Sequence, residues 1–150
     1  MLLLMDEKDG RILGALEENA RLSTAEISRM TKIPRVTVHE RIQKLKESGV
    51  IERFTVKLNG KKTGLPSTAF VLISYSQNQR QNQRKLAKQI AGLEHVKEVH
   101  IIGGEWDLLV KIVGKSVEDI GKVVVDKIRE FEGVGKTLTV ASWETVKEMP

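Results

Sequence analysis

Few residues in this sequence are equipped for catalysis or for metal binding. The chain has three histidines and no cysteine, which excludes thiolate chemistry and disulfides. The densest group of possible metal ligands is Glu94, His95, Glu98 and His100, and the last two share one face of a predicted strand. Two such residues on a strand more often form an ion-paired edge than a metal site, and no phosphate-binding glycine loop occurs. We expect no metal, no cofactor and no enzymatic activity.

The loop Gly103-Gly104-Glu105-Trp106-Asp107, between two apolar segments, is a second candidate for chemistry. Glycine leaves backbone N–H groups open to a carboxylate, and Asp107 could accept from an ammonium group, so the loop could hold a free amino acid. The alternative is that the glycines allow the positive φ of a tight turn and that Asp107 satisfies the backbone there. The residues leave both interpretations open.

The basic side chains gather in one part of the chain. The net charge is +5, and residues 31–65 hold nine basic side chains against three acidic ones, whereas residues 101–150 hold seven against nine. The asymmetry favours a polyanionic partner such as double-stranded DNA for the first stretch. The alternative is a helix surface that is rich in lysine for solubility alone.

Residues typical of helix starts and helix ends occur just before the basic stretch and within it. Ser23 and Glu26 fit a capping box that begins a short helix, and Lys32-Ile33-Pro34 then predicts a tight turn. A further helix is predicted over residues 35–48, and Gly49 is a typical residue for its end. Two short helices joined by a turn indicate a helix-turn-helix.

A β-hairpin is predicted after these helices. Residues 50–56 favour a strand, and Asn59-Gly60 is a strong turn signal, so the hairpin would form a wing. We expect a winged helix-turn-helix DNA-binding domain over residues 1–60, with the helix-turn-helix at about 24–43. Residues 61–66, which contain glycine and proline, are predicted to form a linker.

The remainder, residues 67–150, alternates between strand and helix patterns in the order β-α-β-β-α-β, with strands predicted over 68–75, 96–102, 108–113 and 137–146. This order predicts a ferredoxin-like domain, so the fold class is α+β. Helices would cover one face of such a sheet, and strands this apolar require a cover for the other face. Self-association is the simplest cover.

The helix predicted over residues 35–48 carries the candidate DNA-reading side chains. Arg35 could reach guanine, Gln43 could pair with adenine, and Val36 could pack on a thymine methyl group. Lys32, Lys44, Arg53 and the cluster Lys57, Lys61 and Lys62 suit phosphate contacts, which fix register without reading sequence. The alternative is a three-helix bundle with a solvated outer face. The full set of predicted DNA-binding residues is Lys32, Arg35, Val36, Thr37, His39, Glu40, Gln43, Lys44 and Arg53.

Three segments resemble the leucine-responsive regulators of the Lrp/AsnC, or feast/famine, family: Asp6-Glu7-Lys8-Asp9, Glu18-Asn19-Ala20-Arg21-Leu22-Ser23 and Ile33-Pro34-Arg35-Val36-Thr37-Val38-His39-Glu40-Arg41-Ile42. The resemblance spans nearly the whole chain. It implies a transcription regulator that binds pseudo-palindromic sites as a homodimer and assembles to higher oligomers such as an octamer.

The resemblance also implies an effector site, to which a loop with the pattern of Gly104-Glu105-Trp106-Asp107 contributes. By this resemblance the second domain is an effector-binding and oligomerisation domain, and its predicted effector-binding residues are Gly103, Gly104, Asp107, Thr137 and Thr139. Ile101, Ile102 and Gly103 depart from the family, because they are less polar than the hydroxyl-bearing residues usual at these positions.

The function expected is that of a sequence-specific, amino-acid-responsive transcription regulator. An architectural protein that wraps DNA without effector control is the alternative, since it would share every charge feature. The apolar segment Met1–Met5 is too short to span a membrane, so we expect a cytoplasmic protein with no membrane partner.

Overall fold

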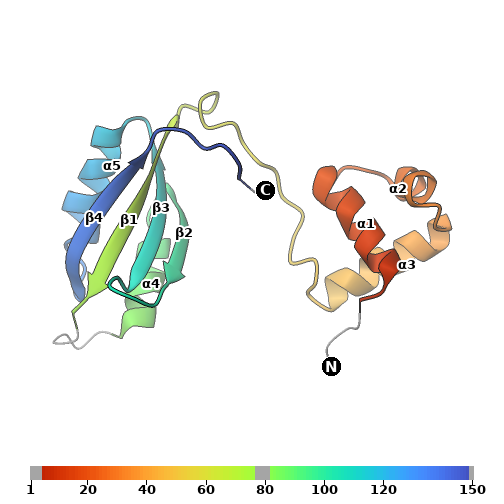
Figure 1. Cartoon of the computed structure of the whole chain (residues 1–150), viewed down its shortest axis with the longest axis horizontal. Coiled ribbons are helices and arrows are strands. Elements are labelled where there is room, and N and C mark those ends of the chain that lie inside the picture. Colours follow the sequence, from red (N-terminus) through yellow and green to blue (C-terminus); the bar gives the residue numbers. More distant parts are fainter. Residues whose placement is uncertain (1–4, 77–81, 149–150) are drawn as a thin grey trace. The chain divides into compact units, whose positions relative to one another are not determined.

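The computed structural model of the 150-residue chain describes residues 5–76 and 82–148. The chain forms two compact units, one that ends at Lys57 and one that spans Leu58–Glu148 (Figure 1). None of the helices in the described residues has the length and apolar character needed to cross a membrane.

The first unit is a bundle of three helices, α1 (Glu7–Glu18), α2 (Thr24–Thr31) and α3 (Arg35–Glu47). The predicted capping box begins α2: the Ser23 N–H donates to Glu26 Oε2 at 2.8 Å, and the Glu26 N–H donates to Ser23 Oγ at 3.3 Å. Each helix buries one apolar face against the others. The buried cluster consists of Ile12, Ala15, Leu16, Ile27, Ile33 and Val38.

Backbone conformation makes the turn between α2 and α3 short. Lys32 adopts the left-handed conformation with φ 55°, and Pro34 immediately precedes α3. Gly49, with φ 75°, lies just beyond the end of α3. The predicted helix-turn-helix is therefore confirmed, with α3 as its second helix.

The predicted wing is wrong for this structure, because no strand forms between α3 and β1. Phe54, Val56 and Leu58 stay exposed, and an isolated two-stranded hairpin without a packing surface is only marginally stable. Asn59 begins a helix-like turn instead of a hairpin turn: its carbonyl oxygen accepts from the N–H of Lys62 and of Thr63, each at 3.0 Å.

The second unit has the predicted ferredoxin-like order. Its elements are β1 (Ser67–Tyr75), α4 (Gln83–Ala91), β2 (Val96–Ile101), β3 (Leu108–Gly114), α5 (Val117–Val123), the π-helical turn η1 (Val124–Ile128) and β4 (Val134–Ser142). The sheet is antiparallel in the order β2-β3-β1-β4. The last strand was predicted three residues too late at its start and four too late at its end, since Gly135 and Lys136 hide the strand pattern there.

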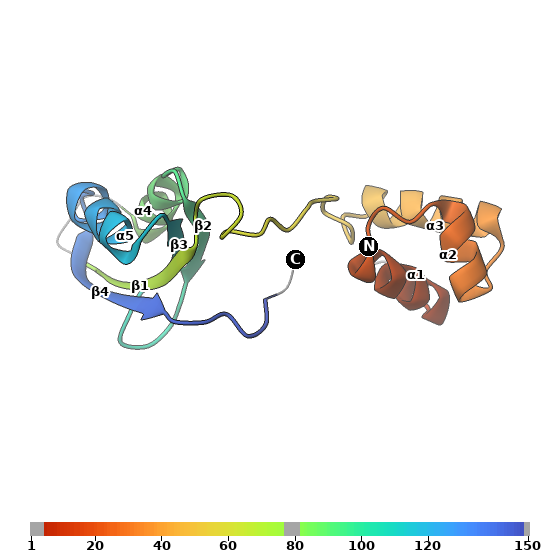
Figure 2. The ribbon, with the colours of Figure 1, turned by 90° about the horizontal axis from the view of Figure 1, so that it is seen from above.

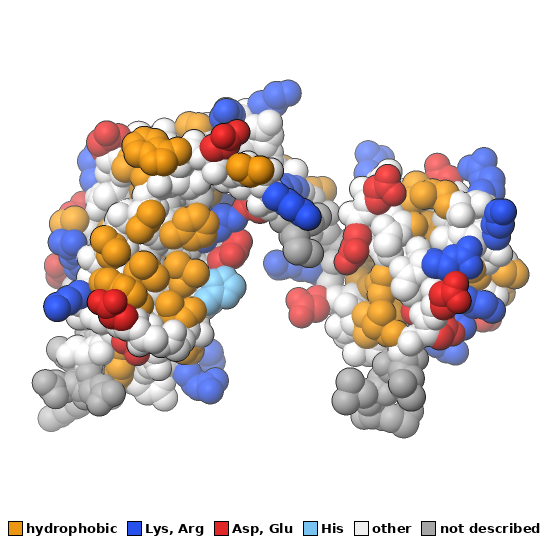
Figure 3. Space-filling model, viewed as in Figure 1, with side chains coloured by type: hydrophobic (Ala, Val, Ile, Leu, Met, Phe, Trp, Pro, Cys, Tyr) orange, Lys and Arg blue, Asp and Glu red, His pale blue; other side chains and the backbone are white. Residues whose placement is uncertain are grey.

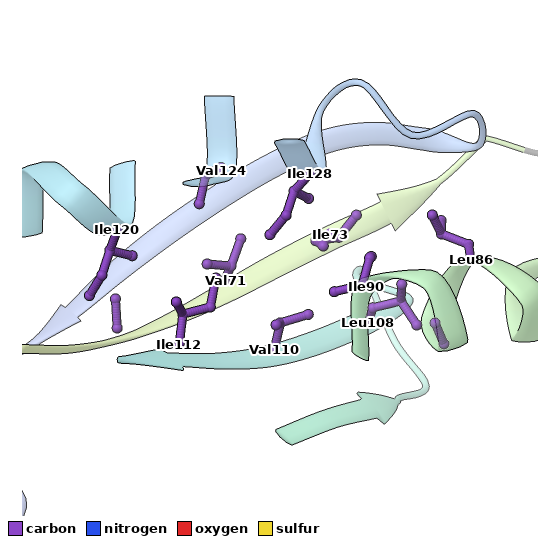
Figure 4. Packing of buried hydrophobic residues seen from close by; sticks show 12 residues of the cluster. Val71, Ile73, Leu86, Ile90, Leu108, Val110, Ile112, Ile120, Val124 and Ile128 are labelled. Carbon is purple, nitrogen blue, oxygen red and sulfur yellow. The ribbon is translucent and has the colours of Figure 1, made fainter. Parts of the chain in front are cut away.

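Both helices pack on one face of this sheet (Figure 2). The core between them is built from alternate residues of β1 and β3 and from the inner faces of the helices (Figure 4). The opposite face is open and apolar, as Figure 3 shows. By register, Val140 pairs with Phe70 and Leu138 with Leu72 on that face, and both β4 residues are 46% exposed.

Candidate functional site

The outward face of α3 carries most of the predicted DNA-binding side chains. Val38 and Leu45 are fully buried and Ile42 packs on the core, so the predicted inward face of the helix is confirmed. Of the nine predicted DNA-binding residues, only Thr37 and Gln43 are half-buried and the others are exposed. Val36 is 69% exposed, so this face presents one apolar side chain among polar ones.

Arg35 lies at the first position of α3, where its side chain is held by α2. Its Nε donates to Thr24 Oγ1 at 3.3 Å, which uses one of the five N–H donors of the guanidinium. The remaining donors project from an exposed residue at the helix start. Arg53, by contrast, lies beyond the end of α3 in a segment without regular structure, so α3 does not fix its position.

Arg41 has a structural role that the sequence did not reveal. Its guanidinium donates to Asp6 Oδ1 at 2.7 Å and to Asp9 Oδ1 at 2.8 Å, which ties α3 to the start of α1. The hydrogen bonds that Arg41 donates to the two carboxylates raise its pKa, and the bond to Asp9 is the larger cause. Arg41 therefore braces the bundle and is not one of the cations free to meet a polyanion.

Loop 103–107 is fixed by its own backbone and by Asp107. Gly104 has φ 125°, a conformation that favours glycine. Asp107 Oδ2 accepts from the Tyr75 N–H at 2.7 Å, and Gln83 Nε2 lies 3.3 Å from the Asp107 carbonyl oxygen. One carboxylate oxygen of Asp107 is thus engaged in holding the loop on β1. An effector role for Gly103, Gly104 and Asp107 stays a prediction.

A shallow hollow of about 480 Å³, largely open to solvent, lies beside this loop at the edge strand β4. Among the predicted effector residues, Thr137 contributes to it, whereas Thr139 lies two residues further along β4 and does not. Trp106, Arg129 and Lys136 were missed, because no local pattern links a loop, a helix end and a strand that lie far apart in sequence. The residues that line the hollow are Trp106, Arg129, Gly135, Lys136, Thr137 and Leu138.

The Glu98 and His100 pair forms an ion-paired strand edge. His100 Nε2 lies 3.2 Å from Glu98 Oε2, and Lys111 Nζ donates to Glu98 Oε1 at 3.1 Å. These hydrogen bonds, first from His100 and then from Lys111, lower the pKa of the Glu98 carboxyl. Within residues 5–76 and 82–148, no three potential metal ligands gather in one place.

Both units match models of known protein families. The AsnC-type helix-turn-helix domain matches residues 5–46, and the Lrp/AsnC ligand binding domain matches residues 68–150. Together the two matches span most of the chain, from α1 through β4.

Curated relatives cover the chain from end to end. An uncharacterized HTH-type transcriptional regulator of Pyrococcus abyssi is 50% identical over 148 residues, which are 99% of either chain. A second, from Pyrococcus horikoshii, is 49% identical over 145 residues, or 97% of either chain. Both relatives are transcription regulators by name, not enzymes.

Solved structures share the fold at lower identity. A transcriptional regulator of Neisseria meningitidis, solved as a complex with L-Met, has a TM-score of 0.89 and 21% identity, with 97% of this chain and 94% of that chain covered. AsnC of E. coli has a TM-score of 0.86 and 23% identity, and the match covers 98% of this chain and 97% of that chain.

Proposed function

This chain belongs to the Lrp/AsnC family of transcription regulators, and on that premise we propose that it reads specific promoter sequences as a dimer and responds to a small effector. DNA binding is implied by its AsnC-type helix-turn-helix. The observation that carries the specific proposal is the outward face of α3, on which polar side chains surround the exposed Val36.

Base reading is assigned to the first turns of α3. In a helix-turn-helix, the second helix enters the major groove and its N-terminal residues meet the base edges. Arg35 is exposed at that end and can donate two parallel hydrogen bonds to guanine. Val36 can pack on a thymine methyl group. Gln43 lies about two turns further along α3 and can pair with adenine.

Phosphate contacts are assigned to exposed cations around α3. Lys32 lies in the turn before the helix, Lys44 lies near the helix end, and Arg53 follows in the next segment. Contacts of this kind set the register of a protein on DNA without reading sequence. They also make binding depend strongly on salt, because each one releases a condensed counterion.

The open face of the sheet supports the proposed dimer. Phe70 and Leu72 on β1, with Leu138 and Val140 on β4, give that face an apolar surface that one chain alone leaves in water. A second copy that packs there would bury it. Two-fold symmetry would then present two copies of α3 to pseudo-palindromic half-sites, spaced by one helical turn of DNA or a multiple of it.

Effector control is assigned to the second unit. The match to the Lrp/AsnC ligand binding domain covers this unit, and the hollow at β4 lies beside the predicted effector loop. A ligand that binds one assembly more tightly than another shifts the balance between them, and so changes the spacing of the reading helices. An amino acid is the effector class proposed.

The test is fluorescence anisotropy with DNA from upstream of the protein's own gene and with a shuffled copy of that DNA, at several salt concentrations. Tight binding to the native sequence alone, shifted by a pool of amino acids, is the expected result. Equal affinity for both sequences with no shift would instead establish an architectural DNA-wrapping protein, and the base-reading role would be wrong.

A further inference from the structure

The side chain of Arg35 is joined to the helix that precedes it. Its Nε donates to Thr24 Oγ1 at 3.3 Å. Thr24 is the first residue of α2 and is half-buried, whereas Arg35 is the first residue of α3 and is exposed. The contact therefore links the starts of the two helices of the helix-turn-helix, at the end of α3 to which base reading is assigned.

Two side chains hold the backbone between α2 and α3. Ser28 Oγ donates to the Ile33 carbonyl oxygen at 2.6 Å, inside the turn. Arg11, on α1, donates to the carbonyl oxygen of Thr31, the last residue of α2. Because the backbone of the turn is fixed on both sides, the starts of the two helices keep their separation, and the hydroxyl and the guanidinium stay within reach of each other.

The contact with Thr24 occupies one edge of the Arg35 guanidinium. A guanidinium can donate a parallel pair of hydrogen bonds from Nε with one Nη atom, or from its two Nη atoms. Since the Nε–H of Arg35 is directed at Thr24 Oγ1, the pair of Nη atoms is the one left for DNA. Guanine offers two acceptors in the major groove, O6 and N7, whereas adenine offers one acceptor beside a donor. A pair of donors held in this way selects guanine.

The order that this contact imposes favours bases over phosphates. A long side chain loses much rotamer freedom when it is fixed, so a contact that orders it in the free protein lowers the entropic cost of binding a base. Phosphate oxygens compete for the same guanidinium without regard to sequence. A phosphate contact requires another direction of the side chain, so it gains nothing from the contact with Thr24.

We propose that Thr24 is a positioning residue for base reading: its hydroxyl holds the Arg35 guanidinium so that the two Nη atoms donate to O6 and N7 of a guanine. The inference rests on the proposed base reading by α3, and it makes α2 a second determinant of specificity. Thr24 acts through Arg35 and needs no contact of its own with DNA. The start of α2 does not depend on the Thr24 hydroxyl, since Ser23 and Glu26 form its capping box.

The experiment compares Thr24→Val with Thr24→Ser in the full chain. The specificity ratio, affinity for DNA from upstream of the gene divided by affinity for its shuffled copy, is measured by fluorescence anisotropy at one salt concentration. Valine keeps the shape of threonine without the hydroxyl, whereas serine keeps the hydroxyl. Thr24→Val should lower the ratio by about two- to tenfold, as expected for one hydrogen bond, through weaker binding to the upstream DNA alone. Thr24→Ser should keep the ratio, and both variants should keep the melting temperature, because the capping box is intact.

Two further measurements separate positioning from direct contact with DNA. In a chain that already carries Arg35→Ala, Thr24→Val should lower the ratio no further, because the two residues act as one unit. Replacement of each guanine of the upstream DNA by adenine, one at a time, should reveal a position at which the unmodified chain loses affinity and Arg35→Ala does not. At that position Thr24→Val should lose less than the unmodified chain does.

Four outcomes would overturn the inference. An unchanged ratio for Thr24→Val, beside a lower one for Arg35→Ala, would leave base reading standing without Thr24. An equal loss from Thr24→Val with and without Arg35 would make Thr24 a direct contact to DNA. An equal loss from Thr24→Ser and Thr24→Val would show that the hydroxyl is not the cause. An unchanged ratio for Arg35→Ala would overturn base reading by Arg35 itself, and the role of Thr24 with it.

Discussion

Replacement of Ile12 by alanine tests how the first unit holds α3. Ile12 is fully buried in the centre of the three-helix cluster, where it contacts the core that also contains Val38 of α3. Its side chain belongs to no proposed contact with DNA. The variant therefore leaves the reading surface unchanged and weakens only the packing beneath it.

The magnitude follows from the atoms removed. Isoleucine loses three carbon atoms on replacement by alanine, each worth about 0.8 kcal/mol of transfer free energy, or about 2.4 kcal/mol together. The cavity left behind adds to this, so the free energy of unfolding should fall by about 3–4 kcal/mol, within the range of about 2–5 kcal/mol for such changes. A small unit of this size is stable by only about 3–9 kcal/mol, so the loss is a large part of the total.

The two tryptophans make the assay selective. Trp106 and Trp143 both lie in the second unit, so tryptophan fluorescence during a urea titration reports that unit alone. Far-ultraviolet circular dichroism reports the helices of both units. For Ile12→Ala, the dichroism transition should shift to lower urea concentration while the fluorescence transition stays in place.

The matched control is Ile12→Val, which should cost only about 0.5–1.5 kcal/mol. If Ile12→Ala lowered the free energy of unfolding by less than about 1 kcal/mol, the reasoning would be refuted. Truncation of a fully buried isoleucine in a close-packed core removes more packing than that. A shift of the tryptophan transition equal to that of the dichroism transition would refute the assignment of Ile12 to one unit.

Two further predictions concern hydrogen-bonded carboxylates. The backbone N–H of Asp9 holds the pKa of Asp6 below its ordinary value of 3.8, so ionised Asp6 stabilises the first unit above that pH, and its contribution is lost as the pH falls through the lowered value. Asp6→Asn should therefore flatten the acid side of a plot of melting temperature against pH, and an unchanged slope would contradict this. Asp107→Ala should destabilise the second unit by about 1–3 kcal/mol, since the Tyr75 N–H loses its acceptor. Asp107→Asn, which keeps an oxygen there, should cost less in the same urea titration, and equal losses would contradict the contact.

The helices and the sheet order could be predicted because local signals agree with the tertiary structure. Ser23 and Glu26, three residues apart, bond to each other at the start of α2. Gly49, with its positive φ, lies just after the end of α3. Both signals depend only on residues close together in the sequence. The alternation of apolar residues in β1 and β3 likewise reports burial on one face.

The features that the sequence did not predict correctly depend on residues far away in the sequence. The hairpin after α3 had good local signals, but the chain offers it no surface to pack on. The start of β4 is a strand because it pairs with the end of β1 and anchors Lys136 on Ser74, which no local pattern shows. The sequence of the basic stretch did not show that Arg41 forms ion pairs with Asp6 and Asp9.

The central claim, that the start of α3 reads bases, is tested most directly by the specificity ratio of Arg35→Ala beside that of Lys61→Ala. The ratio compares affinity for DNA from upstream of the gene with affinity for shuffled DNA at one salt concentration. Arg35→Ala should lose about 1–3 kcal/mol on the native sequence and little on the shuffled one, whereas Lys61→Ala should weaken both alike. Equal losses on both sequences for Arg35→Ala would contradict base reading by α3.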